Sequence, residues 1–148
     1  MSDFFSPKTP STPVRHPPLE LFLVEDSALL RDLLIDSFSL IAGLNVAGWA
    51  DSEEDALLHL ERSPCDIIVV DIQLRQGNGI ALLRKLSALQ NNPDRVNIVL
   101  SNNAGRAYRQ LSTQLPNYFL FDKTTQFEEL QQFLTNLGLN LSRPPRQS

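Results

Sequence analysis

The chain has 148 residues with 42% apolar side chains, which is enough to build one ordinary domain around a single core. Its formal charge of −4, a pI near 5.1 and scattered Lys and Arg residues argue against general nucleic-acid binding and against binding to an anionic membrane. The single cysteine, Cys65, excludes an intrachain disulfide, and no export signal or membrane-length apolar run is present, so we expect a cytoplasmic protein.

Proline marks both ends of the sequence. Seven of the ten prolines lie within residues 1–18 or 139–148. Such segments have little apolar surface to bury and favour extended conformations. We therefore expect a flexible Pro-rich arm over residues 1–18, one folded domain over residues 19–138 and a flexible tail over residues 139–148.

Short apolar runs alternate with amphipathic stretches through the predicted domain. In chain order they predict a strand at Leu19–Val24, a helix at Ala28–Ile41, a strand at Val46–Trp49, a helix at Glu53–Glu61, a strand at Cys65–Val70, a helix at Ile80–Leu89, a strand at Val96–Leu100, a helix at Ala104–Leu115, a strand at Tyr118–Phe121 and a helix at Gln126–Leu137. Thr125 and Glu128 have the spacing of a capping box for the last helix. Five repeats of strand and helix predict an α/β fold with right-handed crossovers and a parallel sheet covered on both faces.

In such sheets the chemistry of a site collects at the carboxyl ends of the strands. Polar residues directly follow four of the predicted strands: Glu25 and Asp26, Asp71, Ser101, and Asp122 with Lys123. Each residue taken singly is more often a helix cap or a solvated loop residue. All of them together at one edge of the sheet predict a functional site.

Carboxylates this close together require a counter-charge. Two of them about 5 Å apart repel by roughly 3 kcal/mol at an effective dielectric near 20, so the cluster either holds protons or binds a hard cation. Oxygen ligands without His or Cys favour Mg²⁺ over zinc, copper or iron. With Mg²⁺ bound, Asp71 can attack a phosphorus atom in line, while Ser101 and Lys123 neutralise the charge on the phosphoryl oxygens.

The sequence resembles the receiver domain of two-component response regulators, of the single-domain chemotaxis type, over Leu19–Leu137. The resemblance rests on "LVED" with Glu25 and Asp26, "IIVVDIQL" with Asp71, "IVLS" with Ser101 and "FDK" with Lys123, and on Gly79 after the third strand. It implies a flavodoxin-like, doubly wound (βα)5 fold with the strand order 2-1-3-4-5.

The resemblance also implies roles for individual residues. Asp71 would accept a phosphoryl group from a sensor histidine kinase or a histidine phosphotransfer protein. Asp26, Asp71 and the main-chain carbonyl of Gln73 would bind Mg²⁺, and Glu25 would act through a coordinated water. Ser101 and Lys123 would contact the phosphoryl group.

Four positions depart from the family's usual pattern. Arg75 and Thr124 stand where the family often has proline, Leu120 stands where many receivers carry a switch aromatic, and Asn102 is larger than the common Ala or Gly. Asn102 is expected to restrict access to the phosphoryl group. Asn103 and Gln73 are expected to affect how long that group survives, in a direction that the sequence does not give.

Three functions follow as hypotheses. The leading one is a phosphorylated switch, and the others are a phosphorylation-independent binding module on the same fold and a small-molecule enzyme such as a flavin protein or an aspartate-nucleophile phosphatase. No effector domain is expected after Leu137, so we expect no direct DNA binding and a protein partner on the face of the fourth helix, fifth strand and last helix. A homodimer is a further candidate assembly.

Overall fold

A computed structural model describes residues 17–89 and 92–140 of the chain. The strands are β1 (Leu19–Val24), β2 (Leu44–Ala50), β3 (Ile67–Asp71), β4 (Val96–Ser101) and β5 (Phe119–Asp122), and the helices are α1 (Ala28–Ser39), α2 (Glu53–Arg62), α3 (Gly79–Leu89), α4 (Ala104–Leu111) and α5 (Phe127–Leu139). The predicted arm and tail fall mostly outside the described residues, so the predicted domain bounds stay predictions.

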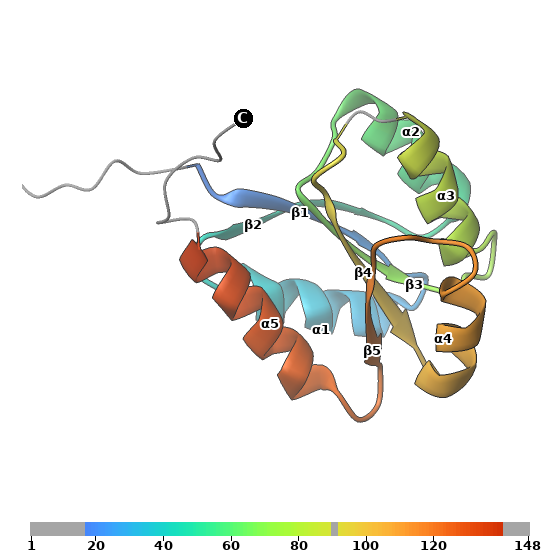
Figure 1. Cartoon of the computed structure of the whole chain (residues 1–148). Coiled ribbons are helices and arrows are strands. Elements are labelled where there is room, and N and C mark those ends of the chain that lie inside the picture. The colour runs from blue at the N-terminus through green and yellow to red at the C-terminus, as the bar shows by residue number, and fades with distance from the viewer. Residues whose placement is uncertain (1–16, 90–91, 141–148) are drawn as a thin grey trace, which may run out of the picture.

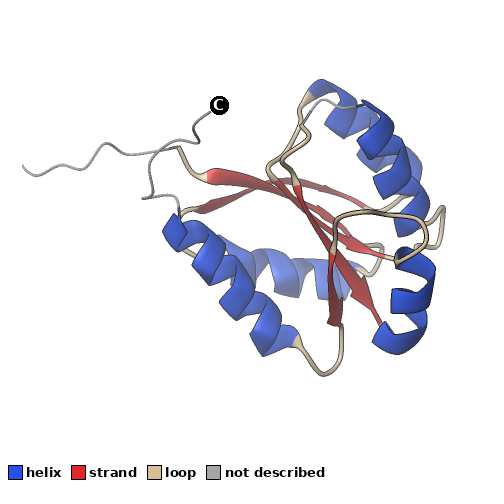
Figure 2. Cartoon of the chain, viewed as in Figure 1, coloured by secondary structure: helices blue, strands red, loops and turns tan. Residues whose placement is uncertain are grey.

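The strands form one parallel sheet in the order β2-β1-β3-β4-β5. Each strand is followed in sequence by a helix that returns the chain to the start of the next strand, and Figure 2 shows the sheet between two layers of helices. The predicted doubly wound fold with the order 2-1-3-4-5 is confirmed.

Successive side chains of the buried strands enter two separate cores, because a strand points alternate residues to opposite faces of the sheet. In β3, Ile68 and Val70 contact the core under α2, α3 and α4, whereas Ile67 and Val69 contact the core under α1 and α5. Figure 1 shows these two helix groups on opposite faces. A strand buried on both faces explains the unbroken apolar run in its sequence.

Three predicted boundaries were wrong in ways that have a physical cause. Helix α4 ends at Leu111. Leu115 continues the apolar pattern of the helix because its side chain is buried, but the residue lies in the loop that follows. Strand β3 begins at Ile67, since the buried Cys65 lies in the preceding turn. Strand β2 begins at Leu44, where it pairs with Leu19 of β1.

The predicted capping box at the start of α5 is also wrong. The helix follows Gln126, whose side chain makes no capping hydrogen bond to the helix. Instead, Asp122 Oδ1 accepts hydrogen bonds from the main-chain N–H groups of Thr124, at 2.8 Å, and Thr125, at 3.1 Å. This aspartate therefore orders the turn after β5 that contains Lys123.

No helix in the described ranges is long and apolar enough to cross a membrane.

Candidate functional site

Four strand ends meet at one edge of the sheet. Glu25 directly follows β1, Asp71 is the last residue of β3, Ser101 is the last residue of β4, and Lys123 directly follows β5. Asp71 is in register with Leu100 next to Ser101, so the ends of β3 and β4 lie side by side. The structure thus brings the predicted site residues to the edge where parallel strands place their ligand chemistry.

The Asp71 carboxylate is held by two donors and is almost fully buried. Its Oδ2 accepts a hydrogen bond from Lys123 Nζ at 2.7 Å, and its Oδ1 accepts one from the main-chain N–H of Gln73 at 3.1 Å. Gly79 is required beside it, because a Cβ on that residue would lie 2.4 Å from the Asp71 carbonyl oxygen. The carboxylate therefore has one orientation, with a cation at its oxygen.

Two further carboxylates complete an acidic cluster. Glu25, Asp26 and Asp71 each offer one oxygen, and these oxygens all lie within 4.8 Å of one another. Glu25 is 1% exposed, and among the described residues its Oε1 has no hydrogen-bond partner, although Lys123 Nζ lies 3.4 Å away as an ion-pair partner. Burial is the main cause that raises the pKa of Glu25, partly offset by the hydrogen bond from the Ser27 N–H.

The donor set fits Mg²⁺. Three carboxylate oxygens converge, one of them buried and lacking a hydrogen-bond donor, and hard oxygen ligands are those that Mg²⁺ prefers. The cluster contains no His or Cys to favour a softer metal. Gln73 lies in the loop that follows Asp71, and the ligand role of its carbonyl stays a prediction.

Lys123 is the only cation within ion-pair distance of Asp71 in the described part of the chain. Burial lowers its pKa, but the hydrogen bond and the charges of Asp71 and Glu25 outweigh burial, and the pKa of Lys123 is raised overall. The side chain therefore carries a positive charge at neutral pH. Its main-chain N–H donates to the Ser101 carbonyl at 2.9 Å, which fixes the start of the turn.

Ser101 is buried, and its Oγ accepts a hydrogen bond from the main-chain N–H of Asn103 at 3.0 Å. A hydroxyl that accepts still has its own O–H to donate. The neighbouring Asn102 is exposed, and Asn103 caps α4 by accepting from the Arg106 N–H.

A family model described as the response regulator receiver domain matches residues 21–135. The chain belongs to this family. Phosphorylation, Mg²⁺ and two-component signalling are typical of receiver domains, which interact with histidine kinases and with downstream targets.

Known proteins similar to this receiver include enzymes and transcription factors that are much longer. It is 38% identical over 68 residues to a protein-glutamate methylesterase/protein-glutamine glutaminase of Treponema denticola, and this match covers 46% of this chain and 18% of the relative. It is 33% identical over 84 residues to the DNA-binding transcriptional activator DevR/DosR of Mycobacterium tuberculosis, and this match covers 57% of this chain and 38% of the relative. The matched segments thus span less than half the length of these relatives.

Solved structures agree with the fold. A LuxR-family response regulator from Aurantimonas superimposes with a TM-score of 0.71 at 19% identity, covering 83% of this chain and 86% of that one. The response regulator domain of Thermotoga maritima CheB gives a TM-score of 0.66 at 19% identity, covering 87% of this chain and 99% of that one. At this level of identity the likeness shows the fold alone.

Two residues that contact Glu25 or Asp26 were missed by sequence reasoning as parts of the site. Arg31 Nη1 donates to the Glu25 carbonyl at 3.0 Å, and its guanidinium carbon lies 3.8 Å from the ring centroid of Trp49. The Arg75 main-chain N–H donates to Asp26 Oδ2. No sequence motif predicts these contacts, because Arg31 reaches Trp49, and Arg75 reaches Asp26, only when segments far apart in the sequence come together.

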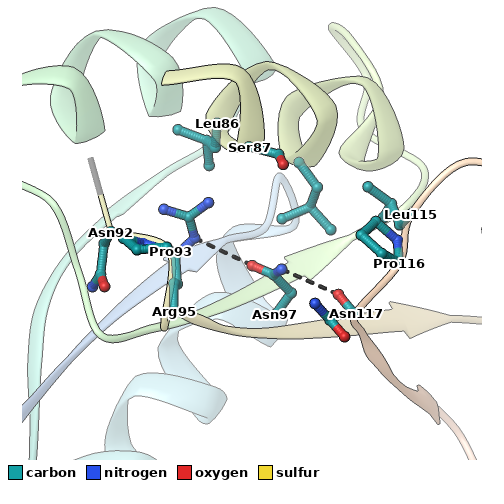
Figure 3. Close-up of a pocket in the computed structure, with 10 residues that line it drawn as sticks. Leu86, Ser87, Asn92, Pro93, Arg95, Asn97, Leu115, Pro116 and Asn117 are labelled. Carbon is teal, nitrogen blue, oxygen red and sulfur yellow. Dashed lines mark hydrogen bonds between the residues drawn. The ribbon is translucent and has the colours of Figure 1, made fainter. Parts of the chain in front are cut away.

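A hollow of about 320 Å³ lies away from this site, between α3, the start of β4 and the loop before β5 (Figure 3). Figure 3 shows the polar groups at this hollow linked in a row by hydrogen bonds. Arg95 Nε donates to Asn97 Oδ1 at 3.2 Å, and Asn97 Nδ2 donates to the Asn117 main-chain carbonyl at 3.2 Å. These bonds tie the start of β4 to the loop that leads into β5. The hollow is open to solvent and lies away from the acidic cluster. The hydrogen bonds at its wall have a structural role at this end of the sheet.

Proposed function

We propose that this receiver accepts a phosphoryl group on Asp71 from a histidine kinase or a histidine phosphotransfer protein, with Mg²⁺. The observation that carries the proposal is the ion pair of Asp71 Oδ2 with Lys123 Nζ at 2.7 Å, beside the buried Glu25 Oε1 that has no hydrogen-bond donor in the described chain. An acceptor carboxylate, a charge-neutralising ammonium and an unmet metal ligand are the parts that phosphoryl transfer requires.

The residues have separate tasks in the transfer. An Asp71 oxygen attacks the phosphorus of a phosphohistidine, the P–N bond breaks, and the imidazole nitrogen keeps the electron pair. The Lys123 ammonium and the Ser101 hydroxyl stand at the same strand ends to bind phosphoryl oxygens. Mg²⁺ held by Glu25, Asp26, Asp71 and the Gln73 carbonyl would supply the remaining positive charge.

A phosphoryl group brings about two negative charges to a site that already holds three carboxylates. This added charge must rearrange the ion pair between Asp71 and Lys123. Because Lys123 directly follows β5, the rearrangement acts on the end of that strand. We infer that the change reaches the face of α4, β5 and α5, where Tyr108 and Phe119 are exposed. The partner would be a separate cytoplasmic protein or a second copy of the chain.

Labelling with small phosphodonors tests the proposal. Acetyl phosphate or phosphoramidate should label the wild-type protein only when Mg²⁺ is present, and Asp71→Asn should abolish the label. Asp51→Asn is the matched control, because the exposed Asp51 follows β2 at the same edge and no metal cluster of the described residues includes it. Normal labelling of Asp71→Asn would contradict the assignment.

A phosphorylation-independent binding module remains the second candidate, because Leu120 packs against the core without an aromatic side chain to rotate. Beryllofluoride with Mg²⁺ separates the two functions. A switch changes its affinity for a partner when this phosphate mimic binds, and a constitutive module does not.

A further inference from the structure

Arg75 contacts Asp26 with both its main chain and its side chain. Its N–H donates to Asp26 Oδ2, its Nη2 lies 3.4 Å from the Asp26 carbonyl oxygen, and its Nε lies 4.0 Å from Oδ2. Arg75 belongs to the loop after β3, so these contacts join the loop that follows Asp71 to the turn that contains Asp26.

The two partners differ in exposure. The Arg75 side chain is 80% exposed, whereas the Asp26 side chain is only 18% exposed. A solvated guanidinium gives up such an ion pair at little cost, since exposed pairs contribute little free energy. Arg75 is therefore a cation that can leave Asp26.

Lys123 does not reach this carboxylate. Its ion-pair distances in the described chain run to Glu25 and Asp71, at 3.4 Å and 2.7 Å, and none runs to Asp26. The Asp26 carboxylate has Arg75 as its cation instead. The acidic cluster thus has one partly buried cation, Lys123, and one exposed cation, Arg75.

We propose that Arg75 is an internal counter-ion that competes with the divalent cation for Asp26 and so sets the metal affinity of the site. This inference rests on the proposed function, in which Asp26 is a metal ligand. A positive charge about 4 Å from Asp26 Oδ2 disfavours a second cation at the same carboxylate. Metal binding then releases the guanidinium from Asp26, and the main-chain N–H keeps the loop in place.

The test is a titration with Mg²⁺ alone, without any phosphodonor. Trp49 is the chain's only tryptophan and is joined through Arg31 to the Glu25 carbonyl, so its fluorescence is a suitable signal. The electron paramagnetic resonance signal of free Mn²⁺ gives an independent measure of occupancy. Arg75→Ala should bind Mg²⁺ about two- to fivefold more tightly than wild type, and the difference should shrink as salt is added.

Three variants make the result specific. Arg75→Lys keeps the charge and should bind like wild type. Arg84→Ala removes the same charge from α3, where the side chain donates to Gln114 at 3.3 Å, and should change nothing. In an Asp26→Asn background, Arg75→Ala should lose its effect, because the carboxylate for which the two cations compete is gone.

The outcomes separate this inference from the proposed function. Equal Mg²⁺ affinity in wild type and Arg75→Ala would overturn the competition while leaving the metal site intact. A tighter affinity in Arg84→Ala of the same size would also overturn it, since the effect would then be one of net charge. Failure of both wild type and Arg75→Ala to bind Mg²⁺ or Mn²⁺ would overturn the metal site and the competition together.

Discussion

Glu25 has a charge that solvent barely reaches. Its side chain is 1% exposed, and the ion pair with Lys123 at 3.4 Å is shared with Asp71, which holds the same ammonium more closely. Burial raises the pKa of Glu25, so ionising this group opposes folding. A site kept at such a cost to stability is consistent with selection for binding rather than for folding.

Glu25→Gln should therefore stabilise the metal-free protein by about 1 kcal/mol at pH 7, because the amide leaves no buried negative charge. Since the folded pKa is raised, the cost of Glu25 is absent below the ordinary value of 4.5 and develops as the pH rises through the folded pKa. Urea unfolding at pH 4 and pH 7 checks this: the two proteins should converge at the lower pH. A variant less stable than wild type at pH 7 would show that the charge of Glu25 is needed for folding.

At the scale of elements, Arg31 links α1 to β2 and to the turn after β1. The guanidinium stacks on Trp49 while it donates to the Glu25 carbonyl, so one side chain fixes both the helix and the acidic turn. A cation stacked on tryptophan contributes roughly 0.5–1 kcal/mol at an exposed site, and the charged hydrogen bond adds a similar amount.

Arg31→Ala should lower the free energy of unfolding by about 1–2 kcal/mol and change the emission of Trp49. Arg31→Lys should recover part of the stability, because it keeps the cation. Denaturant unfolding followed by fluorescence gives both readouts. An unchanged Trp49 spectrum in Arg31→Ala would argue against the stacked arrangement.

Glu53, at the start of α2, holds the loop after β3 in place by hydrogen bonds, and we call this set of contacts the clamp. Glu53 accepts hydrogen bonds from the Asn78 N–H at 3.0 Å and from Lys85 Nζ at 2.5 Å, and its own N–H donates to the Gln76 carbonyl at 3.1 Å. Gly77 has a φ of 99°, and a Cβ there would lie 2.3 Å from Glu53 Cβ, so only glycine fits against the clamp. This loop connects Asp71 to α3.

Glu53→Gln should lower the free energy needed to open the loop by less than about 1 kcal/mol at pH 7, since Lys85 is largely exposed. The hydrogen bond from Lys85 is the main cause that lowers the pKa of Glu53, so the clamp stabilises above the ordinary value of 4.5 and is lost as the pH falls through the folded pKa. Amide hydrogen exchange at Gln76–Asn78 should be faster in the variant at pH 7. Equal exchange rates would mean that the main-chain bond to Gln76 alone holds the loop.

At the scale of the whole molecule, the sequence predicts the sheet and the strand-end site because both depend on local patterns. The apolar strands and the polar residues directly after them are read residue by residue, and parallel topology brings Asp71, Ser101 and Lys123 together. The acidic cluster follows from the same rule.

What the sequence did not predict depends on contacts that form only in the folded chain. Arg31 and Arg75 contact Glu25 and Asp26 only after the chain has folded. Asp122 accepts the hydrogen bond from the Thr125 N–H that Glu128 would accept in a capping box. Leu115 extends the helical period of α4 but is buried from a loop, because burial alone does not require a helix.

Mapping the phosphorylated residue tests the central claim most directly. The protein is treated with phosphoramidate and Mg²⁺, reduced with borohydride, which converts an aspartyl phosphate to homoserine, and digested for mass spectrometry. The account predicts homoserine at Asp71 and nowhere else, with none in samples that lack Mg²⁺. Homoserine at Asp26, or an unmodified Asp71 in a protein that has taken up phosphate, would contradict it.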